Sequence, residues 1–489
     1  MSSRLNPAAK FWLLAHPVHS PAVIDGQSGR TWTYGELDRD VQQAMGRLCV
    51  SGTKALWLLL AQNRYECLVI HLAALRSGNA LLLVDATLDR QLLAGLIRTY
   101  RPELVCAIQS DLELPQYRPI EGLGLAAWQT DAAATPGSAI HASLALLLNT
   151  SGSTGSPKLV RLTCENLQAN AAAIASYLKL TAGERPITAL PMAYSYGLSV
   201  INSHLLAGAT LVLTEHGVLR REFWDSVDRH ACSSLSGVPH SYQMLLQTGL
   251  LGKRGASLRT LTQAGGRLDE RLVRQLHELA LRRGLRVFVM YGQTEATARI
   301  AYVPFEQLGN KIGSIGVPVP GGSLRVDADG ELIYTGPNVM MGYADCRQDL
   351  AKGDELGGVL HTGDLGRRDA DGYFQITGRL RRFLKLFGKR FNLDEVEQIL
   401  QRRFELPTAC FGRDDLLMVA VEVAAAGNDS PVEAITAALR KLFHLPRDAI
   451  QVRAVSALPR TANGKIDYRA LSAAPAAVAQ NARLEVQRA

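Results

Sequence analysis

The segment Thr150-Ser-Gly-Ser-Thr-Gly-Ser-Pro-Lys158 lies between two apolar stretches, residues 144–148 and 159–162. Its glycines leave backbone N–H groups accessible, its hydroxyl groups are further donors, and Lys158 adds a cation. This composition predicts a concave binding site for a polyphosphate. Gly152 and Gly155 precede the lysine as G-x-x-G-x-x-K, whereas a Walker A loop needs G-x-x-x-x-G-K-[ST]. The spacing therefore disfavours a P-loop NTPase.

The composition excludes several classes of protein. The chain has 489 residues, of which 47% are hydrophobic and 20% charged, so it can bury a large core and is neither disordered nor collagen-like. The apolar stretch at residues 55–61 is too short for the roughly 20 residues of a membrane span. At the N-terminus only residues 11–15 are apolar, which is too few for a signal peptide. We therefore expect a soluble, cytoplasmic protein without a membrane partner.

Cysteines and charges narrow the possibilities further. The 7 cysteines are scattered and never form a C-x-x-C pair, which indicates reduced thiols and not a disulfide framework or a zinc site. A net charge of +8 is a mild excess over this length, so we expect no nucleic-acid partner. Eight basic residues do cluster, and they form either a solvated surface or a contact for phosphates or an acidic partner: Arg379, Arg381, Arg382, Lys385, Lys389, Arg390, Arg402 and Arg403.

The hydrophobic pattern predicts an α/β fold. Strand-like and helical stretches alternate through the first two thirds of the chain, which indicates βαβ units in layered, mostly parallel sheets. From about residue 313 short strands and glycines predict a β-rich subdomain, and beyond residue 378 a small α+β unit follows. The expected strands are 55–60, 81–84, 104–108, 144–148, 210–213, 287–290, 316–319, 321–326, 331–334, 383–387 and 416–423. The expected helices are 65–76, 90–100, 393–404 and 431–443, and a further helix has Thr163 as its expected N-cap.

A second glycine motif, Gly122-Leu-Gly-Leu-Ala-Ala127, mimics a dinucleotide-binding fingerprint. It follows Pro119 and Glu121 and not a predicted strand, so it is set aside. The sequence contains no G-x-S-x-G, no H-E-x-x-H and no paired Cys/His spacing. The phosphate-binding segment remains the strongest functional signal.

The phosphate-binding segment resembles the signature loop [ST]-[SG]-G-[ST]-T-G-x-P-K of the adenylate-forming superfamily, which includes acyl-CoA synthetases, adenylation domains and luciferase-like enzymes. The resemblance covers essentially the whole chain, because further motifs of this superfamily follow in the same order. They are Thr33-Tyr-Gly-Glu-Leu37, Tyr291-Gly-Gln-Thr-Glu295, Gly330-Glu-Leu, Gly342-Tyr343, Thr362-Gly-Asp364, Gly378-Arg379 with Lys385 and Gly388, and Pro459-Arg-Thr-Ala-Asn-Gly-Lys465. It implies a large N-terminal adenylation domain (1–378), a small mobile C-terminal domain (379–475) and a tail (476–489).

The resemblance also assigns a nucleotide site for ATP and Mg²⁺. Tyr291 would stack on the adenine, Thr294 would bond the α-phosphate, and Glu295 would ligate Mg²⁺, which prefers oxygen ligands. Asp364 would accept both ribose hydroxyls, with Arg379 assisting. The β- and γ-phosphates would be held by Thr150, Ser151, Gly152, Thr154 and Lys158. Further residues placed at the nucleotide are Ser153, Gly155, Gly265, Gly266, Arg267, Gly292 and Lys385.

Two residues of the C-terminal domain have separate roles by the same resemblance. Lys465 would bridge the substrate carboxylate and the α-phosphate, where negative charge builds up in the transition state. Arg381 would be the hinge about which the small domain rotates between adenylation and thiol attack. Relatives have Asp or Lys at the hinge, and arginine should still allow rotation.

The pocket for the acid is less well defined by the sequence. Tyr194 is the expected aromatic gate, and Ser195 stands where amino-acid-activating relatives place an aspartate for the substrate ammonium. A neutral hydroxyl would leave that ammonium without its countercharge, at a cost of roughly 1–3 kcal/mol or more. We therefore expect an acid without an α-amino group. Arg299 either meets a distal polar or anionic group of the acid or forms a salt bridge within the wall. The other expected lining residues are Tyr196, Ser199, Thr262, Ala264, Met290 and Ala298.

The resemblance thus implies an ATP-dependent acid–thiol ligase that forms an acyl-AMP, releases pyrophosphate and transfers the acyl group to coenzyme A or to the phosphopantetheine of a carrier protein. Acyl-CoA ligases commonly have proline before the E-x-E of the small domain, and residues 391–397 lack it, which weakly favours a carrier. Two alternatives stay open. One is an amino-acid adenylation enzyme serving a peptide synthetase, and the other is a non-catalytic nucleotide-binding scaffold.

Overall fold

The structure of the protein is a computed structural model. It describes residues 9–48, 54–108, 112, 114–121, 124–130, 139–149, 158–380, 382–386, 389–413, 415–423, 431–443, 445–461 and 464–473. The chain divides into two compact units. The first unit comprises Met1–Arg325, Ile333–Thr362 and Asp369–Phe374, and the second comprises Val326–Leu332, Gly363–Arg368 and Gln375–Ala489. The domain boundary expected at residue 378 stays a prediction.

A nine-stranded sheet lies in the first unit. Its centre is parallel, from β1 through β11, β10, β12 and β13 to β14, and antiparallel strands complete both edges. The order is β16 (Val317–Pro318), β15 (Ala301–Tyr302), β14 (Arg286–Tyr291), β13 (Thr260–Gln263), β12 (Ser234–Gly237), β10 (Pro186–Ile187), β11 (Leu211–Leu213), β1 (Pro21–Asp25) and β2 (Thr31–Thr33).

The first unit also contains an eight-stranded sheet. Its order is β19 (Gly342–Ala344), β9 (Leu159–Thr163), β8 (Leu144–Asn149), β4 (Ala80–Asp85), β3 (Leu56–Ala61), β5 (Leu104–Ala107), β7 (Ala126–Thr130) and β6 (Tyr117–Ile120). Only the neighbouring pairs from β8 to β5 are parallel, while the pairs on either side of them are antiparallel. The prediction of mostly parallel pairing is therefore wrong for this sheet, because hairpins extend both of its edges.

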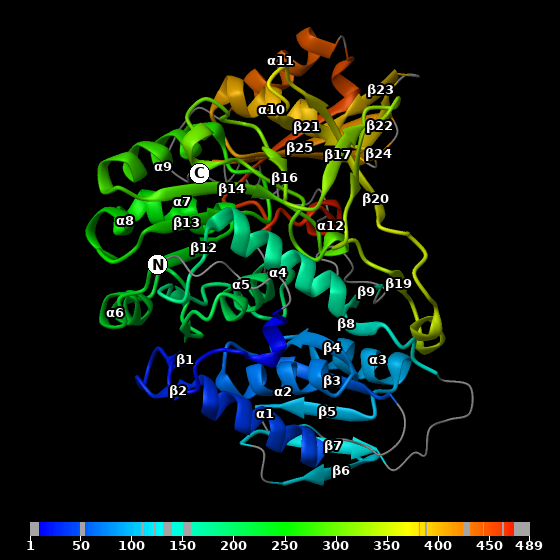
Figure 1. The fold of residues 1–489 in the computed structure, drawn as a ribbon. Coiled ribbons are helices and arrows are strands. Elements are labelled where there is room, and N and C mark those ends of the chain that lie inside the picture. Colours follow the sequence, from blue (N-terminus) through cyan, green and yellow to red (C-terminus); the bar gives the residue numbers. More distant parts are fainter. Residues whose placement is uncertain are drawn as a thin grey trace, which may run out of the picture. The chain divides into compact units, whose positions relative to one another are not determined.

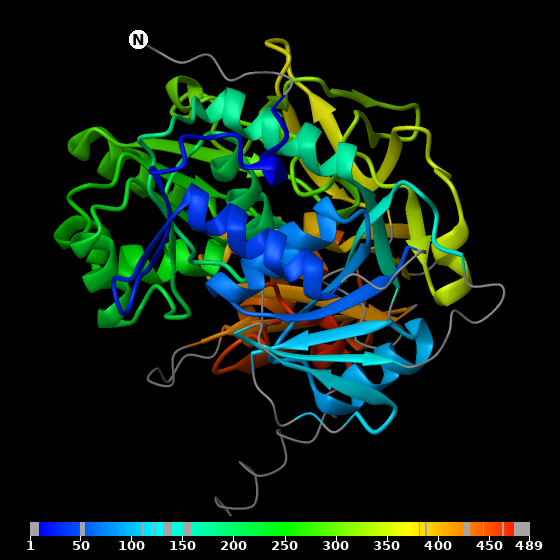
Figure 2. The same ribbon diagram turned by 60° about the horizontal axis from the view of Figure 1, so that its bottom comes forward.

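Strand β6 corrects a second expectation. Residues 117–120 were not expected to form a strand because they contain Pro119, yet they pair antiparallel with β7. Proline is tolerated on an edge strand, where one N–H faces solvent, and β6 is the last strand of the sheet (Figure 2, cyan). The motif at 122–127 thus does follow a strand. It leads into β7 and not into a helix, so it still lacks the context of a dinucleotide-binding fingerprint.

Helices cover both sheets of the first unit in layers. α4 and α5 lie between the two sheets (Figure 1), α6, α7 and α9 pack on the other face of the nine-stranded sheet, and α3 packs on the eight-stranded sheet. The bounds are α1 (Tyr34–Leu48), α2 (Tyr65–Arg76), α3 (Arg90–Tyr100), α4 (Cys164–Leu178), α5 (Ser195–Leu206), α6 (Arg221–Arg229), α7 (Pro239–Thr248), α8 (Leu250–Lys253) and α9 (Glu270–Arg283). Short 3-10 helices are Phe11–Leu13, Thr294–Ala296, Phe305–Gln307 and Arg347–Ala351.

The sequence explains this layering. Every residue of β3, Leu-Trp-Leu-Leu-Leu-Ala, is buried, as expected for a strand that is covered on both faces. α2 and α5 are buried almost all round, which marks helices enclosed by other elements. Thr163 is the N-cap of α4, as expected, and its hydroxyl accepts from the Asn166 N–H at 3.0 Å in a capping box.

The second unit has its own core. A three-stranded sheet of β24 (Thr408–Arg413), β25 (Leu416–Glu422) and β26 (Ile450–Val455) packs against α10 (Leu393–Phe404) and α11 (Val432–Phe443). α12 (Tyr468–Ala473) packs through Leu471 against Phe411 and Ala420. The remaining elements are the hairpin β22 (Phe383–Leu386) and β23 (Lys389–Asn392) and the 3-10 helix Arg447–Ala449. A four-stranded sheet of β17 (Ser323–Val326), β18 (Glu331–Thr335), β20 (Val359–Arg368) and β21 (Phe374–Arg379) has residues in both units.

A buried ionic cluster supports this second core. Arg382 is ion-paired with Asp394 and with Glu397, the latter at 2.7 Å, and its guanidinium lies 4.0 Å from the ring of Tyr468. Glu397 also accepts from the Cys410 N–H. One of the eight clustered basic residues thus has a structural partner and is not a surface charge. No helix among the described residues is long and apolar enough to cross a membrane.

Burial of His71 predicts a pH dependence of stability. His71 in α2 is fully buried beside Asn202, with 3.1 Å between Nε2 and Oδ1, and burial lowers the pKa of His71 from 6.5 to about 4. Between pH 6.5 and 4 the unfolded chain therefore binds a proton that the folded chain does not, so stability is lost as the pH falls. The loss is about 1.4 kcal/mol per pH unit.

We expect His71→Gln to remove this loss. The wild type should lose about 2 kcal/mol more stability than the variant between pH 7 and pH 5. All 5 tryptophans lie in the first unit, so urea unfolding followed by tryptophan fluorescence measures that unit. Substitution of the exposed His19 by Gln is the control. If the free energy of unfolding changed with pH in the same way in wild type and His71→Gln, the low pKa assigned to His71 would be contradicted.

Candidate active site

The segment Tyr291-Gly-Gln-Thr-Glu295 begins at the last residue of β14 and continues into a 3-10 helix. Because β12, β13 and β14 are parallel, it leaves the sheet at the carboxyl edge, where open α/β sheets bind ligands. Tyr291 is buried, and Gln293 Nε2 donates to its hydroxyl at 3.2 Å and to the carbonyl of Thr362 at 2.8 Å. Thr294 and Glu295 are half-buried. One edge of the sheet thus presents an aromatic ring, a hydroxyl and a carboxylate.

The chain turns sharply after this segment. A Cβ atom on Gly292 would lie 1.8 Å from the carbonyl oxygen of Ala298, so only glycine fits there. Thr297 has φ of 56°, and Ala298 has φ of 112°, which lies outside the regions that residues with a side chain normally adopt. Such a conformation persists only where the surroundings enforce it, and it is found most often at functional sites.

Asn338 holds this strained turn. Its Nδ2 donates to the carbonyls of Ala296 at 2.7 Å and Arg299 at 2.8 Å, and its Oδ1 accepts from the Tyr334 hydroxyl at 2.7 Å. The Thr297 hydroxyl donates to the Asn338 carbonyl at 2.6 Å. Asn338 is buried, so the Ala296 and Arg299 carbonyls and the Tyr334 hydroxyl would lose this partner without access to water if the side chain were removed.

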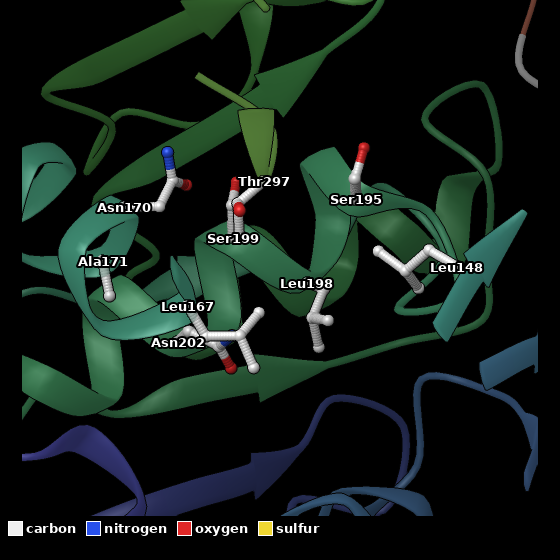
Figure 3. A pocket seen from close by; sticks show the side chains of 9 residues that line it. All are labelled: Leu148, Leu167, Asn170, Ala171, Ser195, Leu198, Ser199, Asn202 and Thr297. Atoms are coloured by element: carbon white, nitrogen blue, oxygen red, sulfur yellow. The ribbon is translucent and has the colours of Figure 1, made fainter. Parts of the chain in front are cut away.

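A small cavity of about 10 Å³ lies beside the turn (Figure 3), about the volume that one water molecule needs. Asn170 on α4 can donate to the Thr297 carbonyl at 3.0 Å and accept from the Arg299 N–H at 3.3 Å. Figure 3 shows Ser195 and Ser199 on the same helix, α5, with Ser195 on the side of Leu148. The lining residues are Leu148, Leu167, Asn170, Ala171, Ser195, Leu198, Ser199, Asn202 and Thr297.

Ser195 joins the start of α5 to the segment after β14. Its hydroxyl lies 3.2 Å from the hydroxyl of Thr294. The sequence assigned Ser195 to the acid and Thr294 to the α-phosphate, and the fold brings these two side chains into direct contact. The contact places an expected acid-binding residue beside an expected phosphate-binding residue.

Glu295 and Lys158 are linked through Tyr343, which was not predicted as a site residue. The Tyr343 hydroxyl donates to Glu295 Oε1 at 2.9 Å, and Lys158 Nζ lies 4.0 Å from the centre of its ring. Strand β19, which carries Tyr343, pairs with β9, which follows Lys158. The motif Gly342-Tyr343 was the available signal in the sequence. Its link to Lys158 depends on the pairing of β19 with β9, which joins residues far apart in the sequence.

The turn after β13 lies close to Tyr194. A Cβ atom on Gly265, which has φ of +84°, would lie 2.6 Å from the Tyr194 hydroxyl, and burial raises the pKa of Tyr194 to about 12. Arg267, by contrast, is exposed and pairs with Glu270 at 3.1 Å. The close approach of Tyr194 explains why residue 265 is glycine. The expected nucleotide-binding residue Arg267 is paired with Glu270.

A second cavity of about 10 Å³ lies between α4, α5 and strands β12 to β14. Of the expected pocket residues it contains Thr262, Met290 and Arg299, while Tyr196 donates to the Thr262 carbonyl at 2.8 Å and supports Arg299 on its ring. Ala264 follows β13, and Ala298 lies in the strained turn. The lining residues are Ile174, Leu178, Leu180, Glu184, Val200, Ser203, His204, Ser234, Ser236, Thr260, Thr262, Met290 and Arg299.

Several of these cavity residues were not predicted from the sequence, although a signal existed. Ser234 and Ser236 in β12 alternate, as do Thr260 and Thr262 in β13, so each pair faces one side of the sheet. The polar pairs mark a hydroxyl-lined wall. His204 is fully buried, and burial lowers its pKa to about 4, so it is neutral at pH 7.

In the second unit Asp364 and Arg379 form an ion pair, with 2.9 Å between Arg379 Nε and Asp364 Oδ1. The Asp364 side chain is 2% exposed and that of Arg379 is 59% exposed. The preceding Gly363 has φ of +70°, and its N–H donates to Glu331 Oε1 at 2.8 Å. These two expected ribose-binding residues therefore meet, with the carboxylate buried and the guanidinium at the surface.

Lys465 ends a tight turn in the second unit. The Thr461 N–H donates to the Lys465 carbonyl at 2.8 Å, and Gly464, with φ of +75°, donates to the Thr461 carbonyl at 2.8 Å. Arg460 and Ile466 form an antiparallel bridge around it. Lys465 is half-buried. Hydrogen bonds from both sides thus fix the backbone of this lysine.

Some expected site residues lie outside the described residues, namely Thr150, Ser151, Gly152, Ser153, Thr154, Gly155 and the hinge residue Arg381. Lys385 lies in β22. Among the described residues no group of three or more His, Cys, Asp or Glu could hold a metal ion. Within the part of the chain that the structure describes, the Glu295 carboxylate accepts a side-chain hydrogen bond from Tyr343 alone, which fits Mg²⁺, because that ion takes most of its ligands from phosphates and water.

The clamp around the strained turn gives a stability prediction. Asn338→Ala should destabilise the first unit by about 3 kcal/mol, because it leaves two buried carbonyls and one hydroxyl unpaired. Tyr334→Phe removes only one of these hydrogen bonds and should cost about 1 kcal/mol. Urea unfolding followed by tryptophan fluorescence measures both. Equal losses in the two variants would show that Asn338 does not hold the turn.

Comparison with known proteins places this chain in a family. The sequence profile described as AMP-binding enzyme matches residues 12–344. The chain is 30% identical over 341 residues to a sulfoacetate–CoA ligase of Cupriavidus necator, a match that covers 66% of this chain and 65% of that protein. It is 28% identical over 472 residues to the non-ribosomal peptide synthetase CmlP of Streptomyces venezuelae, covering 91% of this chain and 47% of that protein.

A solved structure shares the fold. The o-succinylbenzoate CoA synthetase of Bacillus subtilis, in complex with its acyl-adenylate intermediate, superposes with a TM-score of 0.75 at 24% identity, covering 96% of this chain and 99% of that one. The layered α/β architecture expected from the sequence is confirmed by this likeness. Because the family profile covers well over half of the sequence, the chain belongs to the AMP-binding enzyme family.

Proposed function

We propose that this protein activates a carboxylic acid with ATP and Mg²⁺ to an acyl-AMP, releases pyrophosphate, and transfers the acyl group to a thiol. The observation that carries the proposal is the contact between Ser195 and Thr294, 3.2 Å apart. An acid oxygen can attack the α-phosphorus only if the two anions are held side by side. A residue from each expected subsite in direct contact supports that arrangement.

The residues of the site match the electrostatic demands of this reaction. Bringing a carboxylate to a triphosphate requires cations and donors at the place where negative charge develops. Lys158 and Lys465 would supply positive charge, and Thr294 a hydroxyl donor. Glu295 would hold Mg²⁺, which supplies charge neutralisation on the phosphates when bound. The backbone of Lys465 is fixed by the turn at Thr461 and Gly464, which favours a positioned cation.

The second unit would contribute to the nucleotide site through Asp364. Its carboxylate is buried and accepts from Arg379 through one oxygen. A buried carboxylate is a suitable acceptor for a vicinal diol, since each of its oxygens can accept an O–H. We therefore assign the ribose to this pair and the adenine to Tyr291.

The acyl acceptor would be coenzyme A or the phosphopantetheine of a carrier protein. The similarity to a CoA ligase supports the first acceptor, and the similarity to a peptide synthetase over 91% of this chain supports the second. Either acceptor needs a reducing compartment, and the described cysteines are free thiols: Cys67, Cys106, Cys164, Cys232, Cys346 and Cys410. We therefore place the reaction in the cytoplasm.

Two alternatives are less well supported. An amino-acid adenylating enzyme would need a countercharge for the ammonium, and Ser195 offers a neutral hydroxyl that already contacts Thr294. A non-catalytic scaffold has no need of Glu295, Asp364 and Lys465, all of which are present.

An exchange assay tests the proposed reaction. We expect acid-dependent exchange of pyrophosphate into ATP over a panel of aliphatic, aryl, hydroxy and amino acids, with acids that lack an α-amino group favoured by roughly tenfold or more. Exchange that depends on amino acids would favour the first alternative. Binding of AMP without pyrophosphate exchange for any acid would favour the scaffold.

Lys465 separates the two half-reactions. Lys465→Ala should lower adenylate formation by about 100-fold or more, because the charge that stabilises the transition state is lost. Thiol transfer from supplied acyl-AMP should stay within about threefold of wild type, since the lysine acts only in the first half-reaction. Lys441→Ala, an exposed lysine of α11 in the same unit, is the control. Equal loss of both half-reactions would contradict this division of roles.

A further inference from the structure

Arg299 is a buried cation at the wall of the second cavity. It follows the strained Ala298, is 2% exposed, and lines the cavity with Thr262 and Met290. Its backbone is fixed on one side by Asn338, which donates to its carbonyl at 2.8 Å. A guanidinium removed from water needs an anion or several carbonyl oxygens as partners, since its solvation is lost on burial.

Two other buried arginines of the first unit have such partners. Arg161 is ion-paired with Glu355 and donates to the carbonyls of Tyr343 and Met341, among others. Arg347 is ion-paired with Glu103 at 2.6 Å, and its Nη1 donates to the carbonyls of Tyr100 and Arg101 at the end of α3. Both are therefore satisfied within the fold and have a structural role.

Arg299 differs from both of these arginines. Among the described residues it forms no ion pair with a carboxylate, its Nη1 donates to the Ala298 carbonyl at 3.2 Å, and its Nε has no partner. Its guanidinium lies 4.0 Å from the centre of the Tyr196 ring, a contact that orients the cation without neutralising it. The fold thus holds an oriented, buried positive charge that it does not itself compensate.

The groups around Arg299 do not supply the missing negative charge. Burial raises the pKa of the neighbouring Tyr177 to about 12 and also raises that of Tyr196, so both phenols are neutral at pH 7. Glu184 lines the same cavity, but its carboxylate accepts from Ser233 and is ion-paired with Arg259 at 3.3 Å. His204, the other ionisable group of the wall, is neutral, and its Nε2 has no partner among the described residues.

The cavity and the contact assigned to the reacting carboxylate both involve helix α5. Ser195, which contacts Thr294, is followed directly by Tyr196, which carries Arg299 on its ring. Consecutive residues of α5 thus carry the hydroxyl contact and hold the buried cation.

We propose that Arg299 binds a second anionic group of the substrate, so that the acid activated by this protein is a short dicarboxylic acid or a carboxylic acid with another distal anion. This inference rests on the proposed function and narrows its substrate class. The distal anion would supply the partner that Arg299 lacks, in a bidentate pair that a guanidinium forms well with a carboxylate. An acid with an apolar tail would leave the cation buried and unpaired, which penalises its binding.

The test measures pyrophosphate exchange with dicarboxylates of three to six carbons, each against the monocarboxylate of equal length. In the wild type we expect kcat/KM for one dicarboxylate to exceed that of its monocarboxylate by at least about 100-fold, because a site built for a polar group rejects analogues that lack it. Arg299→Met should abolish this preference by lowering kcat/KM for the dicarboxylate, and Arg299→Lys should retain part of it. The Arg299→Met variant should keep the wild-type melting temperature, whereas Arg347→Met, which removes the cation paired with Glu103, should lower it.

The outcomes separate this inference from the proposed function. The inference is overturned if wild-type exchange with monocarboxylates equals or exceeds that with dicarboxylates. It is also overturned if Arg299→Met lowers kcat/KM equally for both kinds of acid. Either result leaves the ligase activity standing. If no acid supports exchange, the proposed function fails. Calorimetric titration with the dicarboxylates then decides the inference alone. Binding to the wild type that is lost in Arg299→Met supports it, and absence of binding overturns it.

Discussion

The approach of Gly292 to the carbonyl oxygen of Ala298 is the constraint on which the site depends. It folds residues 292–298 into a turn so tight that a Cβ atom at 292 would lie 1.8 Å from that oxygen, and Ala298 takes φ of 112°. The cost of this conformation is offset by Asn338, which bonds both arms of the turn. One short segment can therefore present Thr294 and Glu295 at the edge of the sheet and bury Arg299 behind it.

Local signals in the sequence predicted many elements of the fold. The helices at Tyr65–Arg76, Arg90–Tyr100 and Leu393–Phe404 have the expected bounds, because apolar periodicity and end signals such as the Asp89 cap of α3 are local properties. Sheet pairing was predicted less well. At the edges of the eight-stranded sheet β19 pairs with β9 and β7 with β5, although neither pair is consecutive in the sequence, and Pro119 concealed the edge strand β6.

In the site, too, local motifs were predicted well and long-range contacts were not. Motifs identified Thr294, Glu295, Asp364 and Arg379, and the fold brings Asp364 and Arg379 together. Tyr343 and Asn338 were missed because their partners lie about 40–180 residues away along the chain. For Arg299 the sequence left a wall salt bridge and a substrate contact equally open. Only the full set of neighbours reveals that no carboxylate among the described residues pairs with it.

A crystal structure of the protein with Mg²⁺ and α,β-methylene-ATP tests the central claim most directly. The account predicts the adenine against the ring of Tyr291, the α-phosphate within hydrogen-bond distance of Thr294, and the metal at Glu295. A nucleotide that binds elsewhere and leaves the segment Tyr291–Glu295 without contact would contradict it.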